Sequence, residues 1–515
     1  MRKTICSGII TFGILVSLSS CYAFDYRSEE AGFSVDIPDD NTIIVSKDLF
    51  AAGSNKSMHG IAAISQQSIE KYTKTAFATN KFESDLKKIA EDIKAGKDIL
   101  ADPAYAYLTV PQNELQVYMQ KLMQDNPQSL PGNKNYKITK INKIPALEIN
   151  NDMLLNYEIK LPIAYTRKEQ QNIQKYNPYV KFSADGKQMT AQYNLISKIY
   201  ILSQNDQLYN ISSGYVEFPA IEQSETVFAE NNADKFIQKF TDNKVDKRAY
   251  KKFSKAFTKK LNFFKPQLSN SELIIKDGIF NKEFKVPHNW LYIQSNQKVE
   301  NMPVSLFSAL PVSSLEKMGK EYIDSKLFNI ETTKIGMNVE SNNIDDFDFS
   351  KILKAYSEGV IGISAEYKPA CPHDQGPKQF LENPVFTKIM FEEFMNKPFL
   401  NPREKAKLEK FVQIKNFTHD IDINQENCLL QFTYDVDLHL PQTLSKINRP
   451  GYDIFQETDL TDLSIHGQKK VYFDADNRIN LLCYFTQDKT MKSNLIQKEY
   501  DSYNLFKSSL LKEKY

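Results

Sequence analysis

The sequence begins a β-strand in the same way at two distant positions. Residues 33–38 read FSVDIP, and residues 284–290 read FKVPHNW. Each stretch starts with phenylalanine, alternates apolar and polar residues as a half-buried strand does, and reaches a proline that ends the strand. A short polar turn follows in both, and the second turn leads to the single tryptophan, Trp290. Two such openings predict two copies of one structural unit, with Trp290 as a core anchor of the second copy.

The first half continues with helices and then hairpins. Phe82, Leu86 and Ile89 recur at helical spacing, and Gly96 is typical of a helix C-terminus. The polar pair Asn205-Asp206, between two apolar runs, indicates a hairpin turn. The predicted elements of this half are helices at 82–96 and 113–125, hairpins at 146–162 and 198–212, and a closing helix at 227–240.

The second half repeats this order of elements. A helix is predicted at 313–323, hairpins at 419–441 and 469–485, and a last helix at 501–511. In the first hairpin, a simple register places apolar residues opposite one another, as a buried sheet face requires. The expected pairs are Ile423 with Cys428, Ile421 with Leu430 and Phe417 with Tyr434, while Asp420 faces Gln431 on the other side. The second hairpin is expected to turn at Asp476-Asn477.

A direct echo supports duplication, because residues 157–161 read YEIKL and residues 434–438 read YDVDL. The second copy is longer, and its extra residues are expected at 340–380, which is rich in Asn, Asp, Pro and Gly. The predicted fold class is α+β, with two tandem modules that each form an antiparallel sheet flanked by helices, an α/β/α sandwich. Two unrelated α+β domains are the alternative. The predicted boundaries are a signal peptide at 1–23, a first module at 24–242, a linker helix at 243–270 and a second module at 271–515.

The two openings, together with INKIPAL at 141–147, resemble the PsbP-like family. The family pattern has tryptophan where the first copy has Asn41, and the second copy lacks the central Pro-Ala-Leu. Members of this family share a scaffold more than a chemistry. The resemblance therefore implies a binding or assembly module that is usually non-enzymatic and, in bacteria, often extracytoplasmic.

The N-terminus is typical of an export signal. Arg2 and Lys3 precede a short apolar run at 5–18. Two cleavage patterns follow: LSSC at 18–21 resembles a bacterial lipobox with Cys21 as the lipidated residue, whereas CYA at 21–23 resembles an ordinary site before Phe24. After residue 23 no apolar run is long enough to predict a transmembrane segment. The expected location is extracytoplasmic. The protein is expected either in the periplasm, with or without a lipid anchor to a membrane, or outside the cell as a secreted protein.

The charge balance argues against nucleic acid as a partner. The chain has 65 Lys and Arg against 64 Asp and Glu, a formal net charge of +1, whereas nucleic-acid binding needs a broad basic surface. Three cysteines lie beyond the signal: Cys371, Cys428 and Cys483. At most one internal disulfide can form among them, and buried free thiols are the simpler interpretation of Cys428 and Cys483.

One segment departs strongly from this neutral balance. Residues 244–265 contain nine Lys or Arg and a single acid, Asp246. Apolar side chains recur every three or four residues, which predicts an amphipathic basic helix. It either attaches to an anionic membrane surface or acidic partner, or is an interdomain helix docked through its aromatic face. The candidate surface residues are Lys247, Arg248, Lys251, Lys252, Lys255, Lys259 and Lys260.

The sequence predicts no catalytic residue, metal site or cofactor. It contains no G-x-S-x-G elbow, Gly-rich phosphate loop or H-E-x-x-H motif. Cys371, His373 and Asp374 lack a second ligand pair at zinc-finger spacing, and an exposed loop explains them better. Three further polar residues share one strand face, for which a solvated outer face is the simpler interpretation: Asp435, Asp437 and His439.

These observations favour an exported, non-enzymatic binding or assembly protein of the bacterial cell envelope. Its expected partner is an envelope protein or a membrane surface. A hydrolase that uses scattered His and Asp residues is one alternative, and a secreted factor that acts on a host is another.

Overall fold

The computed structural model describes most of the chain between residues 23 and 486. The described ranges are 23–38, 42–53, 57–65, 81–110, 130–161, 164–176, 179–217, 250–267 without 252, 253 and 256, 273–277, 282–287, 289–299, 302–324, 328–341, 361–369, 412–423, 428–441, 460–473 and 477–486. The helices predicted at 113–125, 227–240 and 501–511 lie outside these residues. So do Cys21, Lys247, Arg248, Lys252 and Cys371.

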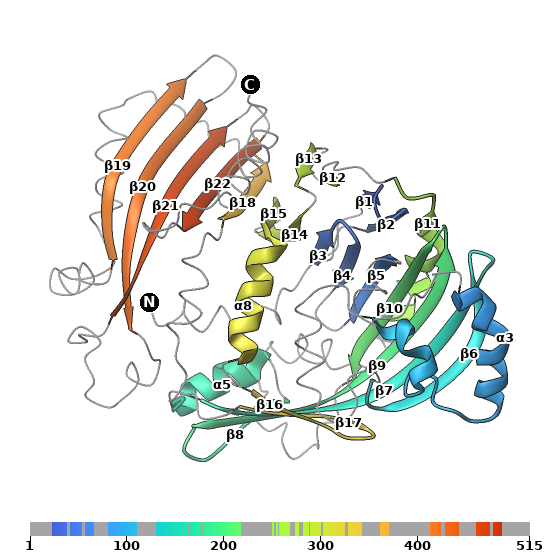
Figure 1. The fold of residues 1–515 in the computed structure, drawn as a ribbon. Coiled ribbons are helices and arrows are strands. Elements are labelled where there is room, and N and C mark those ends of the chain that lie inside the picture. Colours follow the sequence, from blue (N-terminus) through green and yellow to red (C-terminus); the bar gives the residue numbers. More distant parts are fainter. Residues whose placement is uncertain are drawn as a thin grey trace.

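β-Strands make up most of the described residues (Figure 1). The strands of the first half are β1 (Ala23–Ser28), β2 (Phe33–Pro38), β3 (Thr42–Ser46), β4 (Leu49–Gly53), β5 (Ser57–Ser65), β6 (Asn133–Ile141), β7 (Ile144–Lys160), β8 (Lys181–Phe182), β9 (Gln188–Gln204) and β10 (Gln207–Glu217). Those that follow are β11 (Asn262–Phe263), β12 (Leu273–Asp277), β13 (Lys282–Val286), β14 (Trp290–Val299), β15 (Met302–Pro311), β16 (Phe328–Thr332), β17 (Gly336–Ser341), β18 (Ile361–Pro369), β19 (Val412–Ile423), β20 (Cys428–Pro441), β21 (Leu460–Phe473) and β22 (Asn477–Thr486).

Four helical elements accompany the strands: α3 (Lys81–Lys94), the 3-10 helix η1 (Pro103–Thr109), α5 (Arg167–Tyr176) and α8 (Val312–Asp324). The helices predicted at 82–96 and 313–323 are confirmed as α3 and α8. Gly96 follows α3 with a positive φ of 75°, the left-handed conformation that ends helices and that glycine adopts without strain. Within the described residues, no helix combines the length and the apolar character needed to cross a bilayer.

The large sheet runs through both halves of the chain. Its ladders pair the strands in the order β19-β20-β21-β22-β18-β15-β14-β3-β4-β5-β10-β9-β7. β6 and β17 share the other edge of β7, β16 pairs with β17, and β8 pairs with β9. The β17–β7 ladder is parallel and the others are antiparallel, so the sheet is mixed. Figure 1 shows the two halves of this sheet on opposite sides of α8.

The prediction of two α+β modules, each a sheet flanked by helices, is wrong. The structure is mostly β, and strands of the two halves pair with each other in one sheet. β3 pairs with β14, and β7 pairs with β17, so residues of the two halves share backbone hydrogen bonds. The physical reason is that an unpaired strand edge exposes a row of N–H and C=O groups, which a neighbouring strand satisfies. Local sequence patterns do not show which strand that neighbour is.

The two halves nevertheless repeat one pairing order. Outward from the central β3–β14 ladder, the first half runs β3-β4-β5-β10-β9-β7-β6 and the second runs β14-β15-β18-β22-β21-β20-β19. The small five-stranded sheet has the order β11-β2-β1-β12-β13, with hairpins from the two halves joined by β1 and β12. In the second half, α8, β16 and β17 stand between β15 and β18, where the first half has three residues between β4 and β5.

The hairpin predictions meet different outcomes. The β9–β10 hairpin is confirmed, and Asn205 and Asp206 have the positive φ values, 51° and 60°, of a two-residue turn. The hairpin predicted at 146–162 is wrong, because residues 146–160 belong to one long strand, β7, that pairs with β9 from Leu147 to Lys160. The turn instead lies at Asn142 and Lys143, between β6 and β7.

The register predicted for 419–441 is confirmed where Thr418–Ile423 of β19 pair with Cys428–Thr433 of β20. Ile423 pairs with Cys428, Ile421 with Leu430 and Asp420 with Gln431. The register shifts between Lys415 and Thr418, so the expected Phe417–Tyr434 pair falls at this irregularity. The last predicted hairpin forms as β21 and β22, and its innermost pair is Phe473–Arg478.

Two clusters of buried side chains lie on opposite faces of the β5-β10-β9-β7 part of the sheet. Helix α3 packs on one face, where Phe82 and Ile89 join Leu147, Ile149 and Ile201. The other face carries the larger cluster, which also takes in the small sheet. Trp290 is fully buried in this larger cluster, so its prediction as a core anchor is confirmed. Its backbone N–H donates a hydrogen bond to the Pro287 carbonyl across the turn.

Candidate functional site

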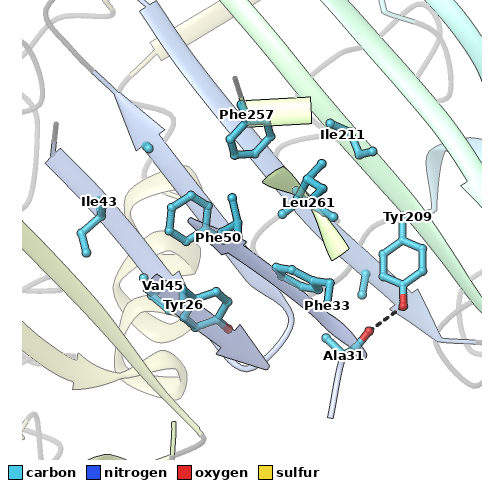
Figure 2. Packing of buried hydrophobic residues seen from close by; sticks show 14 of the residues in the cluster. Tyr26, Ala31, Phe33, Ile43, Val45, Phe50, Tyr209, Ile211, Phe257 and Leu261 are labelled. Carbon is cyan, nitrogen blue, oxygen red and sulfur yellow. Dashed lines mark hydrogen bonds between the residues drawn. The ribbon is translucent and has the colours of Figure 1, made fainter. Parts of the chain in front are cut away.

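The basic segment forms a docked helix. Residues 250, 251, 254, 255 and 257–260 are helical, and we call these residues the basic helix. Phe257 and Leu261, which follows the last turn, are each 1% exposed and belong to the larger buried cluster. Phe257 stacks on Phe50 of β4, with 6.2 Å between the ring centroids. Figure 2 shows both side chains within the buried cluster. The apolar spacing that predicted the helix therefore also positions its buried face.

The C-terminal end of the basic helix is fixed by further contacts. The Leu261 carbonyl accepts a hydrogen bond of 2.7 Å from the Asn142 side chain, in the β6–β7 turn. The next two residues form β11, which pairs with β2 through Asn262–Ser34 and Phe263–Phe33. The segment thus continues from the helix directly into the small sheet, and it is part of the folded core.

A buried polar cluster lies under the first turn of the basic helix. The Ser213 hydroxyl lies 2.9 Å from His59 Nδ1, 3.0 Å from the Tyr250 hydroxyl and 3.2 Å from the Ser254 hydroxyl. The Tyr250 ring stacks on His59, 5.4 Å between centroids, and contacts Tyr215 at 4.6 Å. These contacts join β5 and β10 to the helix and hold it in one orientation on the sheet.

The Ser213–His59 pair has the distance of a nucleophile and its base, which raises the hydrolase alternative. Sequence reasoning missed it because 154 positions separate the two residues and no motif marks either one. Ser213 is 2% and His59 1% exposed, and Tyr250 stacks over the imidazole. A substrate would have to displace the basic helix to reach the hydroxyl. The pair is therefore best explained as a docking contact.

Acidification is expected to destabilise the protein through His59. Burial lowers the pKa of His59 to about 4, while its ordinary value is 6.5. Because the pKa of His59 is lower in the folded protein, its contribution to stability is fully present above pH ~6.5 and is lost as the pH falls towards 4. Between these pH values, His59 is protonated in the unfolded chain but still neutral in the folded protein. Between pH 7 and pH 5, the free energy of unfolding of the wild type should fall by about 2 kcal/mol more than that of His59→Gln. Urea denaturation at both pH values measures this difference, and equal losses would contradict it.

The outer face of the basic helix is made of lysines. Among its described residues, the exposed ones are Lys251, Lys255, Lys259 and Lys260. The first three follow one another at intervals of four and form a stripe along the helix, which we call the lysine face. Lys260 pairs with Asp36 of β2 at 2.7 Å. Within the described part of the chain, the lysine face has no carboxylate at salt-bridge distance.

The described residues show no candidate metal site on this surface. Over the described residues, no three His, Cys, Asp or Glu side chains gather closely enough to hold a metal ion. His373 and Asp374 lie outside the described residues, together with Cys371. Asp435, Asp437 and His439 lie at alternate positions of β20, as expected from the sequence.

No family model matches the chain, and comparisons with curated proteins and with solved structures give no match. The resemblance to the PsbP-like family therefore stays a prediction. The fold and the site define a coarser class: a mostly β protein with an internally repeated pairing order, which carries a docked basic helix on its sheet.

Proposed function

We propose that this protein is an exported, non-enzymatic binding or assembly protein of the bacterial cell envelope, and that it holds an anionic partner on the lysine face. The observation that carries the proposal is the sidedness of the basic helix. Its aromatic and serine residues contact the sheet. Its exposed described residues are all lysines, and within the described part of the chain only Lys260 among them has a salt-bridge partner. A cluster of positive charges on a nearly neutral protein attracts an anionic surface.

Rigid docking strengthens this interpretation. A flexible lysine-rich tail loses conformational entropy when it binds. The backbone of a docked helix is already ordered before binding, so this part of the entropy loss does not oppose the binding of its lysines. The export signal predicted at 1–23 supports an envelope location. The burial of Ser213 and His59 beneath the helix supports a binding role over hydrolysis.

A polyanion column tests the proposal. The variant Lys251→Glu/Lys255→Glu/Lys259→Glu is expected to bind immobilised dextran sulfate roughly tenfold more weakly than the wild type and to elute at lower salt. A matched control is Lys87→Glu/Lys94→Glu/Lys187→Glu, which makes the same change of charge at exposed lysines elsewhere. The control should elute close to the wild type. If both variants shift equally, binding depends on net charge alone and the lysine face is not the site.

A further inference from the structure

We infer that the lysine face and the start of β1 form one membrane-facing surface, on which anionic lipid headgroups bind Lys251, Lys255 and Lys259. The inference rests on the proposed function and names its partner. Two observations support it. Ala23 at the start of β1 pairs with Pro38 of β2, and the exposed described residues of the basic helix are lysines, with no aromatic residue among them.

The start of β1 lies close to the end of the basic helix. Ala23, the first described residue, pairs with Pro38 at the end of β2, and Asp25 pairs with Asp36. Asp36 in turn holds Lys260 of the basic helix at 2.7 Å. Because strands are about 4.8 Å apart and rise about 3.3 Å per residue, Ala23 lies about 8 Å from Asp36 between Cα atoms.

The segment that leaves the basic helix joins the same small sheet. β11 pairs with β2 on the edge opposite β1, at Phe33 and Ser34, which pair with Ser28 and Arg27 of β1. Two strand spacings, about 10 Å, therefore separate β11 from the end of β1, and Ala23 lies at the other end of this strand. Figure 1 shows β1, β2 and β11 together. In the sequence, Cys21 precedes Ala23 by two residues.

The chemistry of the exposed side favours a lipid surface over a protein. The centre of a protein interface is depleted in lysine and enriched in aromatic residues. Here Phe257 and Leu261 are buried inside the protein, and the exposed described positions of the helix are lysines. Such a face cannot insert into a bilayer, but it can lie on phosphate headgroups, where each lysine strengthens binding about fivefold.

A lipid on Cys21, as predicted from the sequence, would give the protein a second attachment to the membrane. One acyl chain alone holds a protein to a membrane only marginally, and a basic patch beside it makes the attachment stable. The predicted lipid on Cys21 and the lysine face would then act together, because only one residue, Tyr22, separates Cys21 from β1 in the sequence. The lysine contacts themselves do not require it, because charge attraction acts over about 8–10 Å at physiological salt.

Vesicle binding tests the lipid contact. The chain from residue 22 onward is mixed with phosphatidylcholine vesicles with and without phosphatidylglycerol, and bound protein is measured by sedimentation. The wild type should bind the phosphatidylglycerol vesicles about 100-fold more tightly than Lys251→Glu/Lys255→Glu/Lys259→Glu, since three lysines are lost. The Lys87→Glu/Lys94→Glu/Lys187→Glu control should bind as the wild type does. Equal binding by the three proteins would overturn the inference.

A tethered version tests the shared surface. The same chain carries an N-terminal hexahistidine tag and is held on vesicles that contain a nickel-chelating lipid. With phosphatidylglycerol present, Lys251, Lys255 and Lys259 should become several-fold less reactive towards an amine reagent, read out by mass spectrometry. Lys87, Lys94 and Lys187 should keep their reactivity. Equal labelling of both sets would overturn the inference, and dextran sulfate binding without vesicle binding would leave the proposed function standing with a different partner.

Discussion

Replacing Phe257 with alanine is expected to lower the free energy of unfolding by about 3–5 kcal/mol. The Phe257 side chain is 1% exposed and contacts the rings of Phe50 and His59, at centroid distances of 6.2 Å and 6.0 Å. Its removal leaves a cavity that the surrounding sheet cannot close fully. Urea denaturation followed by far-ultraviolet circular dichroism measures the change.

The matched control lies two residues further along. Lys259 is exposed, and Lys259→Ala should change the free energy of unfolding by no more than about 0.5 kcal/mol. If Phe257→Ala proved as stable as Lys259→Ala, the basic helix would not be part of the core, and the sidedness on which the proposed function depends would be lost.

Replacing Gly336 with alanine should have a similarly large effect, because this glycine sits where the two halves of the chain meet. A Cβ atom at Gly336 would lie 1.9 Å from the Leu154 carbonyl oxygen and 2.7 Å from its carbon. Both atoms belong to the β7 backbone, so β17 would have to move away from β7 and break the parallel ladder. We expect a loss of about 3 kcal/mol in the free energy of unfolding.

Glu340→Ala provides the comparison on the same strand. Glu340 is exposed, and its replacement should cost no more than about 0.5 kcal/mol. Equal stability of Gly336→Ala and Glu340→Ala would show that β17 and β7 are not in contact in solution. The shared sheet that replaces the two predicted modules would then need revision at this ladder.

Local signals predicted the local elements well. The periodicity of Phe82 and Ile89 and the glycine at position 96 defined α3, and Asn205-Asp206 defined a hairpin turn. The pattern failed at β7, where a hairpin was predicted at 146–162. Asn151 is 1% exposed and donates to the Pro131 carbonyl at 3.0 Å, so a tertiary contact decides its conformation.

Contacts between distant segments could not be predicted from the sequence. An alternating strand shows which face is buried, but it does not say which strand lies at its edge. The β3–β14 and β7–β17 ladders therefore went unforeseen, and the fold class was wrong. The candidate site divides in the same way: spacing predicted the lysines and aromatics of the basic helix, whereas the His59 and Ser213 contacts depend on residues far apart in the sequence.

The central claim is that the basic helix is docked through its aromatic face before any partner binds, so that its lysines alone meet that partner. Native-state hydrogen exchange of the full chain, without and with phosphatidylglycerol vesicles, tests this claim most directly. The amides of residues 257–261 should already be protected in the absence of vesicles, to about the same degree as those of β10. Exchange at the rate of an unfolded chain until vesicles are added would show that the helix forms on the membrane with its aromatic face inserted, and would contradict the account.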